Sequence, residues 1–321
     1  AFKPDVIHIT VPDFVGISLI RFAKKNRIPV VISYHTDFPS YLKSYKLGAF
    51  YKMAWRYFKW FYNKSNVVLA PTVEMIKKLN HNRIKNVKLW NRGIHSHLYK
   101  PELRSAQLRE KWGASAKKVI LYSGRFVWYK DLKTFLDVYD AFKQDPTANV
   151  QFVLAGDGPI ADQLKKRMPD AIFTNYLEAK ELSIVYASSD LLLFPSTTET
   201  FGNVVLESLA SGIPAVVSDE GGCKEIVRQS KGGLVAKRKD PVDFFNKCKE
   251  LLGNEQIYAE CRKSGLAYAR EQDWQKINLN VIHQYMDIMT IKSTVTDRHF
   301  TLDRNRKTEE PVISEPTVRS A

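Results

Sequence analysis

The feature that most restricts the fold of this chain is a regular alternation of short Val/Ile/Leu-rich runs with amphipathic stretches. Runs such as VVIS (residues 30–33) and LLLF (residues 191–194) are apolar throughout, as expected for strands that are buried on both faces. The stretches between such runs repeat apolar residues at helical spacing. This alternation predicts parallel, doubly wound α/β sheets. Strands are expected within residues 5–10, 29–35, 66–72, 87–90, 117–125, 150–159, 171–175, 190–196, 213–218 and 232–236.

The alternation stops once, at NRGIHSHLYKPELRS (residues 91–105), and then restarts. This predicts a linker between two α/β domains, which 321 residues are enough to build. We expect one Rossmann-like domain over residues 1–97 and a second one, with terminal helices ending near Met289, over residues 98–290. Residues 291–321 are polar and are expected to form a mobile tail. Because ligands of such sheets bind beyond the carboxyl ends of the strands, the predicted site is the cleft between the domains.

The net charge of +15 is concentrated in the first part of the chain. Residues 1–100 contain 18 Lys and Arg against 4 Asp and Glu, whereas the remaining residues contain 31 against 30. Such an excess predicts an anionic partner. Nucleic acid is not expected, because the sequence contains no recognised nucleic-acid-binding module.

Residues 41–64 are dense in aromatic and basic side chains, and a helix is expected over residues 45–63. A basic, aromatic helix is typical of a membrane interface. The alternative is a core-packed helix with a solvated basic face. We expect contact with an anionic membrane surface, and hence a cytoplasmic protein that is peripheral on the cytosolic face of a membrane. No apolar run approaches the length of a membrane span.

Cysteine and histidine do not form metal-ligand clusters. Cys223, Cys248 and Cys261 show no C-x-x-C spacing, which predicts free thiols in a reducing compartment. We therefore expect no metal site and no cofactor.

Glycine-bearing turns follow four expected strands of the second domain, where glycine permits close approach of the backbone to a ligand. They contain Gly124, the turn Gly156–Asp157–Gly158, Gly202, and the pair Gly221–Gly222.

Two acids, Glu199 and Glu207, flank the expected start of a helix within PSTTETFGNVVLESLASGIPAVVS (residues 195–218). The free N–H groups at such a start form a phosphate site. Arg125 and Lys130, which follow the first strand of the second domain, can hold a diphosphate there without metal and stabilise it as it leaves. Since a carboxylate accepts hydrogen bonds from vicinal hydroxyls, one acid is expected to bind a sugar and the other a ribose.

The runs SGR…K, LAGDGP and DLLLFPSTTETFGNVVLESLASGIPAVVSDEGGCKEIV resemble the retaining family 4 glycosyltransferases of GT-B fold, and the resemblance covers residues 1 to about 290. It implies that Glu207 binds the nucleotide ribose and that Glu199 contacts the transferred sugar. It also implies that Arg125 and Lys130 bind the diphosphate. Further donor-binding positions are the backbone around Phe201, Gly202 and Asn203, and the turn Gly156, Asp157 and Gly158.

SYHTDFPSYLKSYKL and LWNRGIHSHLYKPE are similar to the branch that contains GDP-mannose-dependent mannosyltransferases and sulfolipid- and glycolipid-forming enzymes. The resemblance implies that His35 lies near the donor sugar, with Asp37 at a neighbouring position of the site. It further implies transfer of a hexose from GDP-mannose or a UDP-sugar to a lipid or glycan hydroxyl.

Two departures from the family accompany this resemblance. The first strands and the glycine-rich loop that open the family's N-terminal domain are absent, so this domain is expected to be incomplete. VWYK follows Arg125 where the family has a more polar turn. Two other functions stay open, a sugar-nucleotide epimerase of GT-B fold and a non-catalytic, membrane-associated binding protein.

Overall fold

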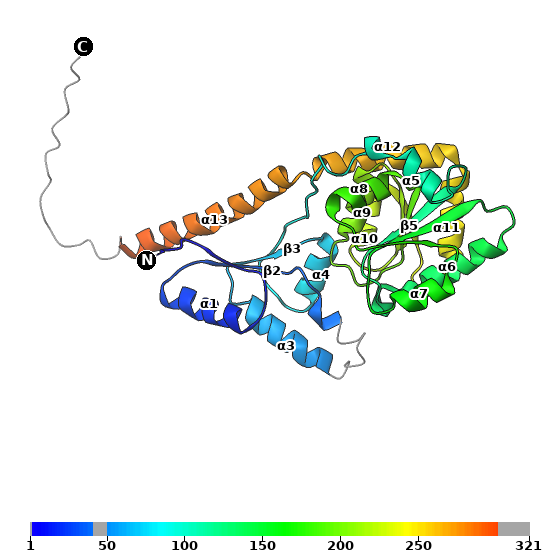
Figure 1. Cartoon of the computed structure of the whole chain (residues 1–321). Coiled ribbons are helices and arrows are strands. Elements are labelled where there is room, and N and C mark those ends of the chain that lie inside the picture. Colours follow the sequence, from blue (N-terminus) through cyan, green and yellow to red (C-terminus); the bar gives the residue numbers. More distant parts are fainter. Residues whose placement is uncertain (1, 41–49, 301–321) are drawn as a thin grey trace, which may run out of the picture.

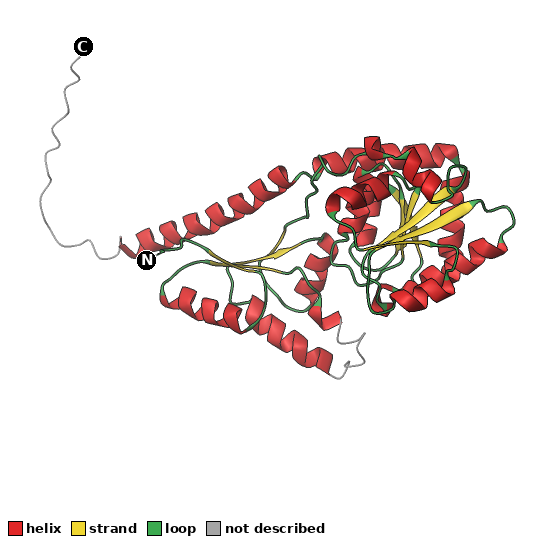
Figure 2. Ribbon diagram, viewed as in Figure 1, coloured by secondary structure: helices red, strands yellow, loops and turns green. Residues whose placement is uncertain are grey.

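The computed structural model describes residues 2–40 and 50–300, with side chains described as far as residue 290 (Figure 1). This part contains two parallel sheets, which Figure 2 shows as two separate groups of strands. The first has the order β1-β2-β3-β4 and the second the order β10-β9-β8-β5-β6-β7. All strands expected from the apolar runs are present: β1 (Ile7–Ile9), β2 (Val30–Ser33), β3 (Val67–Ala70), β4 (Val87–Leu89), β5 (Lys118–Ser123), β6 (Val150–Ala155), β7 (Ile172–Asn175), β8 (Leu191–Phe194), β9 (Ala215–Ser218) and β10 (Gly233–Ala236).

The first sheet is covered on one side by α1 (Phe14–Lys25) and α3 (Tyr51–Tyr62) and on the other by α13 (Trp274–Phe300) (Figure 1). The helix α4 (Val73–His81) lies at the end of this sheet that faces the second domain (Figure 1). Val281 and Ile288 of α13 pack against β2 and β3 in one buried apolar cluster. The C-terminal helix therefore completes the core of the first domain.

The second sheet carries helices on both faces, as expected for a doubly wound fold (Figure 1). One face carries α6 (Leu132–Gln144), α7 (Ala161–Arg167) and α11 (Pro241–Gly253). The other carries α8 (Ala179–Ala187), α9 (Asn203–Ala210), α10 (Cys223–Ser230) and α12 (Glu255–Glu271). Short helices that the sequence did not predict are η2 (Pro101–Leu103), α5 (Ala106–Lys111) and η3 (Trp128–Lys130).

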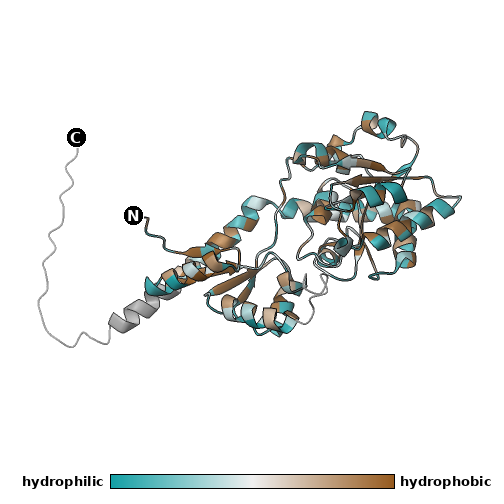
Figure 3. Cartoon of the chain, turned by 60° about the horizontal axis from the view of Figure 1, so that its bottom comes forward, coloured by the Kyte–Doolittle hydropathy of each residue, from teal (hydrophilic) through white to brown (hydrophobic). Residues whose placement is uncertain are grey.

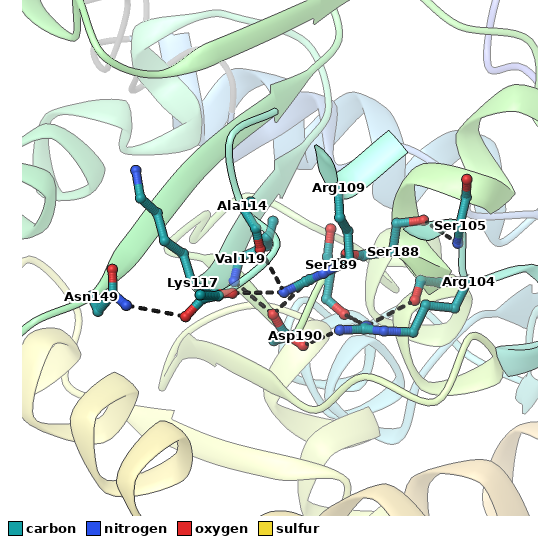
Figure 4. Close-up of polar contacts among 12 residues, drawn as sticks. Arg104, Ser105, Arg109, Ala114, Lys117, Val119, Asn149, Ser188, Ser189 and Asp190 are labelled. Carbon is teal, nitrogen blue, oxygen red and sulfur yellow. Dashed lines mark hydrogen bonds and ion pairs between the residues drawn. The ribbon is translucent and has the colours of Figure 1, made fainter. Parts of the chain in front are cut away.

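Strand order reverses between β5 and β8, so the loops after these two strands diverge and leave a crevice at the carboxyl edge of the sheet. The opposite edge is held by a buried carboxylate (Figure 4). Asp190 accepts hydrogen bonds from Arg104 (2.8 Å), Arg109 (2.9 Å) and the backbone N–H of Val119 (2.7 Å). This network joins the linker and α5 to the amino ends of β5 and β8, far from the crevice.

Helix ends differ from expectation at two places. The expected end near Met289 is too early, because α13 continues to Phe300 into the segment that was expected to be a tail. The expected helix over residues 45–63 is present as α3, Tyr51–Tyr62, while residues 45–49 lie outside the described part. The expected mobile tail beyond residue 300 also lies outside it.

The strands of both domains consist mostly of hydrophobic residues (Figure 3), and most of these residues are buried. Cys223, Cys248 and Cys261 are buried free thiols, as the sequence predicted. Among the described helices, none has the length and apolar character needed to cross a membrane.

Candidate active site

The carboxylate of Glu199 lies on the loop after β8, at the crevice. It forms an ion pair with Lys130, the last residue of η3, and accepts a hydrogen bond from the Ser196 hydroxyl (3.2 Å). Both side chains of the ion pair are largely shielded from solvent, with 15% of Lys130 and 20% of Glu199 exposed. The backbone of Glu199 is also held, since its carbonyl accepts from the N–H of Gly222 (2.7 Å). The sequence-predicted Glu199 and Lys130 are therefore in direct contact, and the carboxylate has a defined position.

Arg125, the other predicted diphosphate ligand, lies two residues after the end of β5. Its side chain is exposed, and within the described residues its guanidinium has no ion-pair partner. Its carbonyl accepts a hydrogen bond from the buried Tyr122 hydroxyl (3.3 Å), which fixes the backbone beneath it. The structure thus places an exposed cation just after the carboxyl end of β5.

The glycines of the turn after β6 are required by a neighbouring loop. Gly156 has φ +138°, and a Cβ there would lie 2.0 Å from the carbonyl oxygen of Gly124. A Cβ on Gly158 would lie 2.3 Å from the carbonyl oxygen of Phe126. The N–H of Phe126 in turn donates a hydrogen bond to the backbone carbonyl of the exposed Asp157 (2.9 Å). The glycines therefore permit close contact between the turn after β6 and the loop after β5, and this contact holds both of them at the crevice.

The helix α9 begins at Asn203, with Gly202 as the preceding residue in a left-handed conformation (φ +106°). A Cβ on Gly202 would lie 2.4 Å from the Sγ of Cys223, so only glycine fits. Asn203 is exposed, whereas the Phe201 side chain is buried in the core of the second domain. This helix start follows the loop after β8, and the first N–H groups of a helix have no partner in the preceding turn of that helix. The phosphate site at this helix start stays a prediction.

Glu207 lies inside α9 and faces two buried tyrosines. Burial raises the pKa of Glu207, while interactions with the hydroxyls of Tyr186 and Tyr99 oppose that rise. The two rings pack edge to face at 5.9 Å. The Tyr186 hydroxyl has no partner of ordinary hydrogen-bond geometry within the described residues. The carboxylate is thus held in a buried recess beside the hydroxyls of Tyr186 and Tyr99.

His35 follows β2 in the first domain and packs edge to face on Trp90 at 5.1 Å. Burial, together with the charge of Arg92 and the neighbouring His8, lowers the pKa of His35 to about 4. The imidazole is therefore neutral at pH 7. Its Nδ1 is buried and has no hydrogen-bond partner in the described part of the chain. A neutral imidazole with a free nitrogen can exchange a hydrogen bond with a sugar hydroxyl.

Asp37 is buried and already has several partners. Its carboxylate accepts from the hydroxyls of Tyr34 (2.7 Å) and Ser40 (2.6 Å) and forms an ion pair with Lys78. These contacts make Asp37 a support for the loop after β2, in addition to the site position that the resemblance implies.

A cavity of about 620 Å³ lies between the two domains. The first domain contributes Asp37, Glu74 and Lys78 to its lining, and the second contributes Glu199 and Gly221. No group of three or more His, Cys, Asp or Glu side chains within residues 2–40 and 50–290 is arranged to hold a metal ion.

Several residues of the site were not predicted from the sequence. Tyr99 and Tyr186, which contact Glu207, and Trp90, which packs on His35, were not identified as site residues. Trp90 and Tyr99 nevertheless lie within LWNRGIHSHLYKPE, one of the runs that carry the family resemblance, and this was the available signal for both. Thr200, which contacts the first domain, was also missed.

Comparison with known proteins gives two family matches. Residues 105–268 match the family described as "Glycosyl transferases group 1", and residues 1–98 match "Glycosyltransferase Family 4".

Curated relatives are similar over most of the chain. A GDP-mannose-dependent alpha-mannosyltransferase of Corynebacterium glutamicum is 30% identical over 302 residues, covering 92% of this chain and 70% of that protein. The sulfoquinovosyl transferase SQD2 of Arabidopsis thaliana is 31% identical over 285 residues, covering 85% of this chain and 55% of that protein. An alpha-monoglucosyldiacylglycerol synthase of Streptococcus pneumoniae is 28% identical, covering 67% of this chain and 52% of that protein.

Solved structures share the fold. A sucrose-phosphate synthase from Thermosynechococcus elongatus superposes with a TM-score of 0.77 at 18% identity, covering 89% of this chain and 74% of that one. Anabaena HepE, solved in complex with UDP, superposes with a TM-score of 0.76 at 19% identity, covering 88% and 79%. The two facing Rossmann-like domains are therefore those of a GT-B fold, as the sequence predicted.

Proposed function

The chain belongs to the family 4 glycosyltransferases, and from that premise we propose that it transfers a hexose from a nucleotide diphosphate sugar to a hydroxyl of a lipid or glycan, with retention of configuration. The observation that carries the proposal is the fixed Glu199 carboxylate at the carboxyl edge of the second sheet, paired with Lys130. The relatives named for GDP-mannose favour that donor. The alpha-monoglucosyldiacylglycerol synthases favour a lipid acceptor.

In the proposed arrangement, the donor lies across the crevice between β5 and β8. Glu207 accepts hydrogen bonds from the ribose hydroxyls, and the N-terminus of α9 together with Arg125 and Lys130 holds the diphosphate. Glu199 and His35 contact the transferred hexose from the two domains. The roles of Gly156, Asp157 and Gly158 are to shape the loop that borders the nucleotide.

The reaction breaks the bond between the anomeric carbon and the diphosphate oxygen and forms a bond from the same carbon to the acceptor oxygen. The diphosphate leaves with the bonding electrons, and the cations beside it stabilise the developing charge. In a retaining reaction without a protein nucleophile, a phosphate oxygen of the leaving group takes the proton of the acceptor hydroxyl. This step is the one that family membership implies.

The test compares transfer with nucleotide binding. We expect Glu199→Ala to abolish transfer from the preferred donor while the free nucleoside diphosphate still binds, because Glu207, the N-terminus of α9, Arg125 and Lys130 are all retained. A matched control is Glu110→Ala, on the exposed surface of α5 at the other edge of the sheet. Retained transfer in the Glu199 variant contradicts the role of this residue. Epimerised donor sugar in an incubation without acceptor favours an epimerase instead.

We also propose that the first domain lies on an anionic membrane surface through α1 and α3. These helices are neighbours, since the Tyr57 hydroxyl donates to the carbonyl of Pro12 (2.9 Å). They expose large apolar side chains, with 87% of Phe14, 61% of Met53 and 47% of Trp60 accessible. Exposed cations accompany them at Arg21, Lys24, Lys25, Lys52 and Arg56. Aromatic side chains flanked by cations suit the interface of an anionic bilayer.

Vesicle sedimentation tests this surface. We expect the protein to pellet with phosphatidylcholine vesicles that contain phosphatidylglycerol and to release at high salt. Reversal of charge at Lys52 and Arg56 should weaken this binding, whereas the same reversal at Lys165 and Lys166 on α7 should not. Equal loss in both double variants refutes a specific face.

A further inference from the structure

We propose that Thr200 is a positioning residue that couples contact between the two domains to the placement of Glu199 opposite His35. The inference rests on the proposed function, because it assigns a task to the neighbour of Glu199. It goes beyond that function because it names a residue that acts on Glu199 and His35 through their backbones.

Thr200 joins the second domain to two strand ends of the first. Its hydroxyl donates a hydrogen bond to the carbonyl of His35 (2.8 Å), which follows β2. Its own carbonyl accepts a hydrogen bond from the hydroxyl of Thr72 (3.2 Å), which follows β3. Thr72 also caps α4, because the same hydroxyl accepts from the N–H of Met75 (3.2 Å). One residue therefore fixes the loop of Glu199 against the segment that carries His35.

A second contact holds the domains together beside Thr200. The carboxylate of Glu225, from α10, accepts hydrogen bonds from the backbone N–H groups of Val73 and Glu74, both at 2.9 Å. A carboxylate at the start of a helix such as α4 interacts favourably with the helix dipole. Lys224 adds an ion pair with Glu74 (2.8 Å). These groups link α10 to the start of α4 and hold the two domains in register beside the loop of Glu199.

The loop that carries Thr200 is packed so that a displacement of Thr200 moves Glu199. A Cβ on Gly222 would lie 2.5 Å from the carbonyl oxygen of Thr200, which shows how closely the turn before α10 supports this loop. The N–H of Gly222 donates to the carbonyl of Glu199 (2.7 Å). Phe201 anchors the other side in the core. Glu199 and Thr200 therefore form one rigid unit, and the bond to His35 sets the position of that unit relative to the first domain.

The position of the Thr200 hydroxyl indicates that it orients the two domains rather than stabilising either domain. The hydroxyl of Thr200 bonds across the domain boundary, whereas the core of each domain is complete without it. Removal of the hydroxyl should therefore leave the stability of each domain and the nucleotide contacts of the second domain intact. It should affect the steps that need His35 and Glu199 on the same sugar.

Thr200→Val tests the proposal, because valine has nearly the same shape and no hydroxyl. The assay measures release of nucleoside diphosphate from UDP-glucose or GDP-mannose, whichever the wild type turns over. A hydrogen bond contributes about 0.5–1.5 kcal/mol, so we expect the turnover number to fall about 3- to 10-fold. The dissociation constant of the free nucleoside diphosphate should stay within about 2-fold. Thr200→Ser, which restores the hydroxyl, should recover most of the turnover, and Thr147→Val on the exposed surface serves as the matched control.

Small-angle scattering provides a readout that does not need turnover. If Thr200 and Glu225 hold the domains together, Thr200→Val combined with Glu225→Ala should increase the radius of gyration while each domain keeps its melting transition. Unchanged turnover in Thr200→Val, or failure of Thr200→Ser to recover a lost turnover, overturns the proposal. A wild type that releases no nucleotide from any donor contradicts the proposed function instead. In that case an unchanged radius of gyration in the double variant overturns the inference on Thr200.

Discussion

Replacing Glu207 by glutamine separates the nucleotide-binding role of this carboxylate from its effect on folding. Burial raises the pKa of Glu207, which means that the folded state disfavours the ionised form. A carboxyl group whose pKa is higher in the folded than in the unfolded state contributes less to stability as the pH rises through the interval between the two values. Glutamine has the same shape and no charge. We therefore expect the nucleotide-free variant to melt at the same temperature as the wild type, or higher, at neutral pH.

The loss of nucleotide binding should be much larger. A hydrogen bond to a charged acceptor contributes about 1.5–3 kcal/mol, and the loss of about 2.7 kcal/mol weakens binding about 100-fold. At a nucleotide concentration about 100 times its dissociation constant, the wild type gains about 2.7 kcal/mol. This corresponds to a rise in melting temperature of about 4 °C for a chain of 321 residues, since the unfolding entropy is about 2.1 cal/mol/K per residue. At the same concentration the variant gains about 0.4 kcal/mol, or about 1 °C.

A thermal-shift titration with GDP and with UDP measures both effects on the same samples. The nucleotide that stabilises the wild type also identifies the class of donor. Glu110→Gln, on the exposed surface of α5, is the matched control and should keep the full shift. A Glu207→Gln variant that keeps the full shift refutes the ribose assignment. A variant that melts well below the wild type without nucleotide refutes the argument that the buried charge opposes folding.

Three further outcomes follow from the geometry. Asp190→Ala leaves Arg104 and Arg109 without their carboxylate, so it should lower the free energy of unfolding by about 3–5 kcal/mol, measured by urea denaturation. Asp140→Ala, which removes an exposed ion pair, should lower it by about 1 kcal/mol or less. The pKa of His35 is lowered from 6.5 to about 4, mainly by burial. As the pH drops from 6.5 towards 4, the unfolded state therefore takes up a proton on this imidazole before the folded state does, and the free energy of unfolding should fall. His35→Gln should show a shallower fall in melting temperature over that interval. Gly156→Ala forces a Cβ onto a backbone oxygen at a positive φ and should destabilise the second domain by about 2 kcal/mol or more, seen as a lower melting temperature; an unchanged melting temperature shows that the two turns can separate.

Much of the fold follows from the sequence because strands buried on both faces leave an unbroken apolar signal. Runs such as LLLF (residues 191–194) give no alternative to a buried strand when a glycine- or proline-bearing turn comes next. The end of α13 was missed for the opposite reason. Its residues after Met289 are polar, and polar residues continue a helix as readily as they form a tail.

The sequence predicts the part of the candidate site in which several functional residues lie close together along the chain. Glu199 and Glu207 are close in sequence and bracket a helix start, so their neighbourhood could be inferred without a structure. The partners of Glu207 could not be inferred. Tyr99 reaches it from the linker and Tyr186 from α8, and their approach depends on how α8 and α9 pack. Packing between elements leaves no periodic mark in the sequence of either one.

The contacts between the domains are the hardest part of the structure to predict from the sequence. They also matter most for the proposed reaction, because they bring residues of both domains to one site. Each half of the site is local, since Glu199 belongs to the second domain and His35 to the first. Their relation depends on Thr200, whose hydroxyl is an ordinary feature of a loop until the two domains meet. The bond it makes is a neutral one, worth about 1 kcal/mol, so it can break and form during each cycle of donor entry and product release. The Glu225 carboxylate and the ion pair between Lys224 and Glu74 link the domains beside Thr200 and keep them in register, which leaves the bond of Thr200 to set the position of one loop. A neutral hydroxyl with so local a task gives no signal in the sequence, and for that reason the sequence alone did not point to Thr200.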